Sequence, residues 1–126
     1  MLSLPASVRI YLATESVDMR KGFDGLSALV AAQGRSVFDG EIFVFVSRRG
    51  DRIKLLTWDR GGFVLFYKRL ERGRFRLPLF APGQSTVTLD PTSLAMLLDG
   101  IDIKRVQRPR HWQPPRTLGI DSGSRS

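Results

Sequence analysis

Residues 46–76 read VSRRGDRIKLLTWDRGGFVLFYKRLERGRFR, and this stretch determines the fold that the sequence predicts. Apolar and aromatic residues recur between basic ones, and turns that contain glycine divide the stretch into strand-sized pieces. Ten Lys or Arg residues stand against three acidic residues, Asp51, Asp59 and Glu71, which leaves a net charge of +7. The whole chain carries +8. A folded region with this much charge of one sign predicts an anionic partner.

The first turn of this stretch joins two predicted strands. Residues 41–47, EIFVFVS, are nearly all apolar, which is typical of a central strand covered on both faces. The turn RRGD follows, and Gly50 is the residue expected at positive φ. Residues 52–58 then alternate, so we expect Arg52 and Lys54 on one face and the apolar residues between them on the other.

A second turn, DRGG, leads to residues 63–70. These residues predict a further aromatic strand or a short helix, because periodicity alone does not separate the two. Residues 75–77 are expected to begin a last strand, and the proline-containing residues 78–85 are expected to form a loop.

A strand and a helix are predicted on the N-terminal side of the basic stretch. Residues 8–12, VRIYL, predict the strand, and residues 19–32 carry apolar residues at helical spacing. We expect Asp18 or Asp24 to cap this helix and Gly34 to end it.

The clearest helix signal is the run DPTSLAMLLDG. Asp90 is the expected N-cap, Pro91 stands at the first helical position, and Gly100 follows the end. Together the elements predict the α+β class: an antiparallel meander sheet with one or two helices packed on a face. We expect a single domain over residues 1–103 and a basic, disordered tail rich in Pro, Gly and Ser over residues 104–126.

Composition limits the classes of function. The chain has no cysteine, which excludes a disulfide framework, a thiolate metal site and a cysteine nucleophile. No apolar run approaches the roughly 18 residues of a membrane helix, and the N-terminus lacks the pattern of a signal peptide. We therefore expect a cytoplasmic protein without a membrane partner.

The basic residues of the hairpins predict a nucleic-acid interface. Guanidinium and ammonium groups neutralise phosphates, and a two-stranded ribbon fits the major groove of DNA. Trp58, Tyr67 and Phe75 lie near these cations, where aromatic rings can stack on unpaired bases. The alternative is a solvated sheet face that its charges protect from edge pairing. The candidate binding residues are Arg48, Arg49, Arg52, Lys54, Trp58, Arg60, Tyr67, Lys68, Arg69, Arg72, Arg74 and Arg76.

No catalytic residue, cofactor or metal is expected. His111 is the only histidine and lies in the predicted tail, while Asp51 and Asp59 lie in predicted turns and Asp90 serves as a cap. The sequence has no phosphate-binding glycine loop, no Ser/His/Asp set and no metal-ligand spacing.

Three motifs resemble a known family: DMRKGFDGL at 18–26, RRGDRIKLLTWDRGG at 48–62 and YKRLERGRF at 67–75. In this order they resemble the small accessory protein, Orf2 or TnpB, of the insertion-sequence family sixty-six. The resemblance implies a role in transposition of a bacterial mobile element. It also implies that a separate transposase performs strand transfer, so no catalytic residue is carried over.

Charge and resemblance together predict a non-enzymatic accessory factor. We expect it to bind DNA, at the element ends or the target, through a basic sheet surface, and to act beside the transposase of the same element. The alternative is an adaptor that docks the transposase without direct DNA contact. The sequence leaves open the form of the DNA and the oligomeric state.

Overall fold

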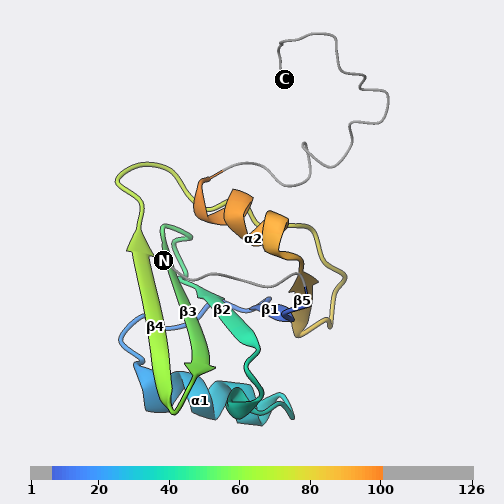
Figure 1. Ribbon diagram of the computed structural model, residues 1–126. Coiled ribbons are helices and arrows are strands. Elements are labelled where there is room, and N and C mark those ends of the chain that lie inside the picture. Colours follow the sequence, from blue (N-terminus) through green and yellow to red (C-terminus); the bar gives the residue numbers. More distant parts are fainter. Residues whose placement is uncertain (1–6, 101–126) are drawn as a thin grey trace, which may run out of the picture.

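The computed structural model describes residues 7–100 and builds them around a five-stranded sheet in the order β4-β3-β2-β1-β5 (Figure 1). Strands β1 and β2 run parallel, and the other neighbouring pairs are antiparallel. The predicted α+β class is therefore confirmed. The strands are β1 Ile10–Ala13, β2 Ile42–Val46, β3 Arg52–Asp59, β4 Gly62–Arg69 and β5 Thr86–Leu89, and the helices are α1 Phe23–Ala32, the short 3-10 helix η1 Val37–Asp39 and α2 Pro91–Leu98.

Strand β2 is the centre of the sheet, as its apolar sequence predicts. All five of its residues are buried, so both faces of the strand are covered. Helix α2 covers one face, where Leu94 and Leu97 contact the core cluster that includes Val44. Helix α1 covers the opposite face, where Leu26 packs in the cluster that includes Phe43. The two helices thus lie on opposite sides of the sheet rather than on a single face (Figure 1).

Strand β4 resolves the alternative between strand and helix in favour of a strand. It pairs with β3 along its whole length, from Arg52 opposite Arg69 to Asp59 opposite Gly62. The two residues of the connecting turn, at 60–61, both have positive φ, of 51° and 87°. This geometry matches the right-handed twist of the strands that it joins.

The last strand lies later in the chain than the sequence predicts. Residues 75–77 form no strand, and β5 pairs instead with β1, Ala13 opposite Thr86. The backbone N–H of Phe75 bonds to the carbonyl of Gly50, so this segment closes onto the β2–β3 turn rather than extending the sheet.

The helix ends follow their sequence signals only in part. Helix α1 begins at Phe23, and neither Asp18 nor Asp24 caps it, because Gly22 occupies the N-cap position without a side-chain bond. Gly34 lies past the end of α1 with a φ of 78°, as predicted.

The predicted tail, residues 104–126, lies outside the described residues. In the part that the structure covers, no helix has the length and apolar character needed to cross a membrane.

Helix α2 has the predicted cap. The carboxylate of Asp90 accepts a 2.7 Å hydrogen bond from the backbone N–H of Ser93, and Pro91 opens the helix. The Ser93 N–H lowers the pKa of Asp90 below its ordinary value. A lowered folded-state pKa means that the cap stabilises the protein above the unfolded-state pKa of about 3.9. That stabilisation is lost as the pH falls through the folded-state value.

Asp90→Ala should lower the unfolding free energy at neutral pH by about 1 kcal/mol, because the helix loses its N-cap acceptor. For a domain of this size the melting temperature should fall by roughly 4–8 °C, which thermal unfolding followed by circular dichroism measures. Asp90→Asn is the matched control, since its amide oxygen retains the cap. Equal melting temperatures for Asp90→Ala and the wild type would show that the cap contributes nothing.

Candidate nucleic-acid interface

Seven arginines gather at the end of the sheet where β2 stops, β3 starts and β4 stops. Arg48 and Arg49 lie in the β2–β3 turn, and Arg52 begins β3 directly opposite Arg69 of β4. The chain after β4 then folds back to the same turn and brings three more arginines. We call this group the basic end: Arg48, Arg49, Arg52, Arg69, Arg72, Arg74 and Arg76.

Two backbone hydrogen bonds fix the returning segment to the turn. The N–H of Leu70 donates to the carbonyl of Asp51 at 2.8 Å, and the N–H of Phe75 donates to the carbonyl of Gly50 at 2.7 Å. The side chain of Arg74 packs against Gly50. A Cβ added at Gly50 would lie 3.5 Å from it, which is an ordinary van der Waals distance. Phe75 is only 5% exposed in the core under α2, so it anchors the segment and is not a free stacking residue.

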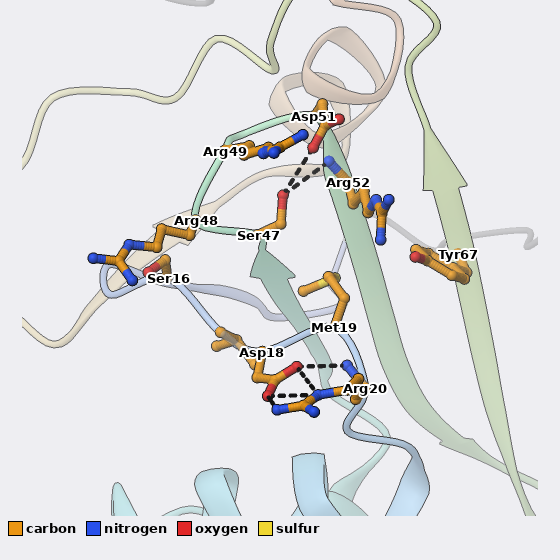
Figure 2. A pocket seen from close by; sticks show the side chains of 11 residues that line it. Ser16, Asp18, Met19, Arg20, Ser47, Arg48, Arg49, Asp51, Arg52 and Tyr67 are labelled. Carbon is orange, nitrogen blue, oxygen red and sulfur yellow. Dashed lines mark hydrogen bonds and ion pairs between the residues drawn. The ribbon is translucent and has the colours of Figure 1, made fainter.

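The β2–β3 turn itself is held by Ser47 (Figure 2). Its backbone N–H donates to the carbonyl of Arg52 at 2.9 Å, and its hydroxyl accepts from the N–H of Arg52 at 3.1 Å. The same hydroxyl donates to the carboxylate of Asp51 at 3.3 Å. Gly50 has a φ of 79°, as the sequence predicts, so the turn has the left-handed residue that it needs.

The charge of the basic end is not neutralised by neighbouring carboxylates. Across residues 7–100 the structure contains one ion pair, between Arg20 and Asp18 at 2.7 Å. None of the seven arginines takes part in it. The acidic residues close to them in sequence are Asp51 and Glu71, so the group keeps a net charge of +5.

A loop that sequence reasoning did not place here forms the other wall of the site. The N–H of Val17 donates to the carbonyl of Val46 at 2.9 Å, which seats the segment after β1 beside the end of β2. Figure 2 shows Asp18 and Arg20 across from the turn, with Tyr67 at the edge. The hollow has a volume of about 860 Å³; its lining residues are Ser16, Val17, Asp18, Met19, Arg20, Ser47, Arg48, Arg49, Asp51, Arg52 and Tyr67.

Asp18 has a local role in that loop. It accepts from both the backbone N–H and the guanidinium of Arg20, and these hydrogen bonds lower its pKa to about 2. The pKa of Arg20 is raised by the same contact. The sequence signal was available in the motif at 18–26, where acid and base stand two residues apart before the helix. Helix capping was a competing interpretation of Asp18, and it is wrong.

Lys54 does not belong to the exposed surface. It lies on the same sheet face as Arg52, as predicted, but it is only 6% exposed. Its Nζ donates to the carbonyls of Met19 and Lys21, at 2.7 and 2.8 Å. The ammonium also lies 4.8 Å from the centre of the Tyr67 ring. Burial and these bonds keep Lys54 away from a phosphate, so we remove it from the contact residues and assign it a structural role.

Three further candidates are not part of the basic end, Lys68 because its side chain lies on the other face and two because they lie far along the hairpin. Lys68 points to the α2 face, opposite Ile53, and its Nζ donates to the carbonyl of Leu98 at 2.6 Å. Trp58 and Arg60 lie at the far end of the hairpin, roughly 20–26 Å along β3 from Arg52 at the usual rise per residue.

Trp58 packs against two other aromatic rings at that far end. Its ring lies edge-on to Phe38 and to Phe63, with 5.0 Å between centroids in both pairs.

The structure brings together eight of the twelve predicted residues, namely the seven arginines and Tyr67. Among residues 7–100, no group of three or more His, Asp or Glu side chains is placed to hold a metal ion. His111 lies outside the described residues.

Comparisons with known proteins identify the family. The family model described as IS66 Orf2 like protein matches residues 8–108. Two proteins of Sinorhizobium fredii (strain NBRC 101917 / NGR234), named uncharacterized protein y4jC and uncharacterized protein y4hO, are each 38% identical to the chain over 117 residues. Each alignment covers 92% of this chain and 98% of the relative. No solved structure gives a significant match. The chain therefore belongs to the IS66 Orf2 like proteins and is an accessory protein of an insertion sequence.

Proposed function

We propose that this protein is a non-enzymatic accessory factor that binds DNA directly through the basic end during transposition. The observation that carries the proposal is the gathering of seven arginines, without an ion pair in the described part of the chain, at one end of the sheet. Like charges held together destabilise a folded protein unless something else compensates for them. In this proposal the phosphates of DNA compensate for the charge of the arginines.

The residue type supports phosphate as the ligand. Every cation in the basic end is arginine, whose planar guanidinium bonds phosphate oxygens in pairs. Six of the seven are exposed, and Arg52 is half-buried at the rim of the hollow. Contacts of this kind orient a protein on DNA and carry little sequence information.

The proposed interface lies at the end of the sheet, whereas the sequence predicts one on the sheet surface. Arg48, Arg49 and Arg72 lie in loops beyond the strands, while Arg52 and Arg69 are the paired residues at the open end of the β3–β4 hairpin. Two loops that are bonded to each other thus present the charge, and the hairpin supports them.

A second candidate function is a protein adaptor, favoured by apolar residues that follow the basic end. Leu79 is 75% exposed, and Leu77 and Phe80 are also exposed. Exposed apolar residues beside arginine are typical of protein interfaces. In this alternative the transposase of the same element docks on the basic end, and DNA is contacted only through it.

DNA binding should depend steeply on salt. If about six phosphates are engaged, the affinity for a duplex should fall by roughly 10³ between about 50 and 200 mM monovalent salt, because bound counterions are released on binding. Fluorescence anisotropy of a labelled duplex, titrated with the full chain at several salt concentrations, measures the slope. A flat response would contradict the proposal.

Charge reversal separates the two candidate functions. Arg72→Glu should weaken duplex binding by about tenfold, since one phosphate contact is lost and a repulsive charge is added. Arg60→Glu is the matched control, because it makes the same charge change in an exposed turn at the far end of the hairpin, and it should bind duplex like the wild type.

If the protein is an adaptor, the same variant should bind DNA like the wild type and lose the transposase. Unchanged DNA affinity for Arg72→Glu, together with loss of co-purification with the transposase, would overturn direct DNA binding. A loss of affinity equal to that of Arg60→Glu would show that only overall charge matters.

A further inference from the structure

We infer that Tyr67 is a stacking platform for an unpaired base and that the basic end binds single-stranded DNA in preference to duplex. The inference rests on the proposed function and deepens it by naming the form of DNA. It depends on the position of one aromatic ring beside two arginines.

Tyr67 is the exposed aromatic residue of the hairpin. It is 50% exposed, whereas Leu65 and Phe63, which share its face of β4, pack against the core under α1. Strand β4 is an edge strand, so within the described residues no further strand covers that side. A nucleic-acid strand can therefore approach the ring from the open edge of the sheet.

Two arginines flank the ring on the same face. Arg52 and Arg69 stand directly opposite each other across β3 and β4, and Tyr67 precedes Arg69 by two residues. The three side chains line a hollow of about 250 Å³, which shares Arg52 and Tyr67 with the larger hollow at the β2–β3 turn. A strand of DNA that passes from one hollow to the other stays beside the arginines throughout.

The positive charges beside the ring favour the binding of an anion. Like charges directly opposite each other in an antiparallel pair are destabilising, and Arg52 and Arg69 are such a pair. Lys54 is paired with Tyr67 across the strands, but its ammonium is buried and bonded to two carbonyls, so the two arginines are the cations that face a ligand here. A nucleotide supplies both a phosphate for the arginines and a flat base for the ring.

Lys54 also holds the platform in place before any ligand arrives. Its ammonium donates to the carbonyls of Met19 and Lys21 and lies 4.8 Å from the Tyr67 ring centre. These contacts tie the 19–21 segment, β3 and the ring together. Order that exists before binding reduces the entropy cost of binding.

The ring distinguishes the two forms of DNA because stacking needs a free base. In a duplex the bases stack on one another, so the arginines contact phosphates and Tyr67 has no partner. In a single strand the arginines make the same contacts and the ring gains a base. Each stacked base is worth roughly a 5- to 150-fold gain in affinity.

The test compares oligo(dT) with a duplex, using anisotropy of labelled DNA and the full chain at one salt concentration. An oligo(dT) of about 20 nucleotides exceeds the roughly 4–16 nucleotides of known single-strand sites. Tyr67→Ala and Tyr67→Leu should weaken oligo(dT) binding by about tenfold and change duplex binding by less than about twofold. Tyr67→Phe should bind like the wild type because it keeps the ring.

Controls separate a local effect from a loss of folding. Phe38→Ala removes another exposed aromatic ring, 61% exposed and in contact with Trp58 at the far end of the hairpin, and should leave both affinities unchanged. Tyr67→Leu keeps apolar bulk over Lys54, so it tests stacking even if Tyr67→Ala unfolds. Thermal unfolding of each variant verifies the fold.

The outcomes of this inference and of the proposed function are distinct. Unchanged oligo(dT) affinity in both Tyr67 variants, or equal losses on oligo(dT) and duplex, would overturn the inference. If Arg72→Glu still weakens duplex binding in that case, the proposed function stands without it. A wild-type protein that binds neither form of DNA would overturn both.

Discussion

The carbonyls of Gly50 and Asp51 accept hydrogen bonds from the backbone of Phe75 and Leu70, and the site depends on this closure. It joins two segments about twenty residues apart in sequence and so brings the arginines of the turn beside those that follow β4. The buried ring of Phe75 prevents the segment from leaving. Without these contacts the same arginines would lie on two independent loops, and no common surface would exist.

The fold tolerates this concentration of charge because its stability comes from elsewhere. Strand β2 is buried on both faces between two helices, and the core clusters on the two sides of the sheet contain none of the seven arginines. The buried cation Lys54 does not need an acidic partner either, because two backbone carbonyls stabilise its ammonium. Charge at the surface therefore stays available for a ligand.

Sequence reasoning predicted the elements whose signals are local. The apolar run of β2, the positive φ of Gly50 and the cap at Asp90 all follow from residue type and spacing. It assigned residues 86–89 to no element and did not predict β5, because the strand that TVTL pairs with, β1, lies far earlier in the chain. It placed Lys54 on the correct face but not under residues 19–21, since alternation does not reveal what covers a face. The contact between the returning segment and the β2–β3 turn was not predicted either, because its two hydrogen bonds are made by backbone groups.

The most direct test of a common DNA-binding surface is a nuclear magnetic resonance titration of the labelled protein with DNA. We expect shifts of the amide signals of Gly50 and Gly73, which lie in the two loops of the basic end, at the same DNA concentration. The signal of Gly61, in the turn at the far end of the hairpin, should stay unchanged. Shifts centred on Gly61, or none at Gly50 and Gly73 when DNA is bound, would contradict a common DNA-binding surface.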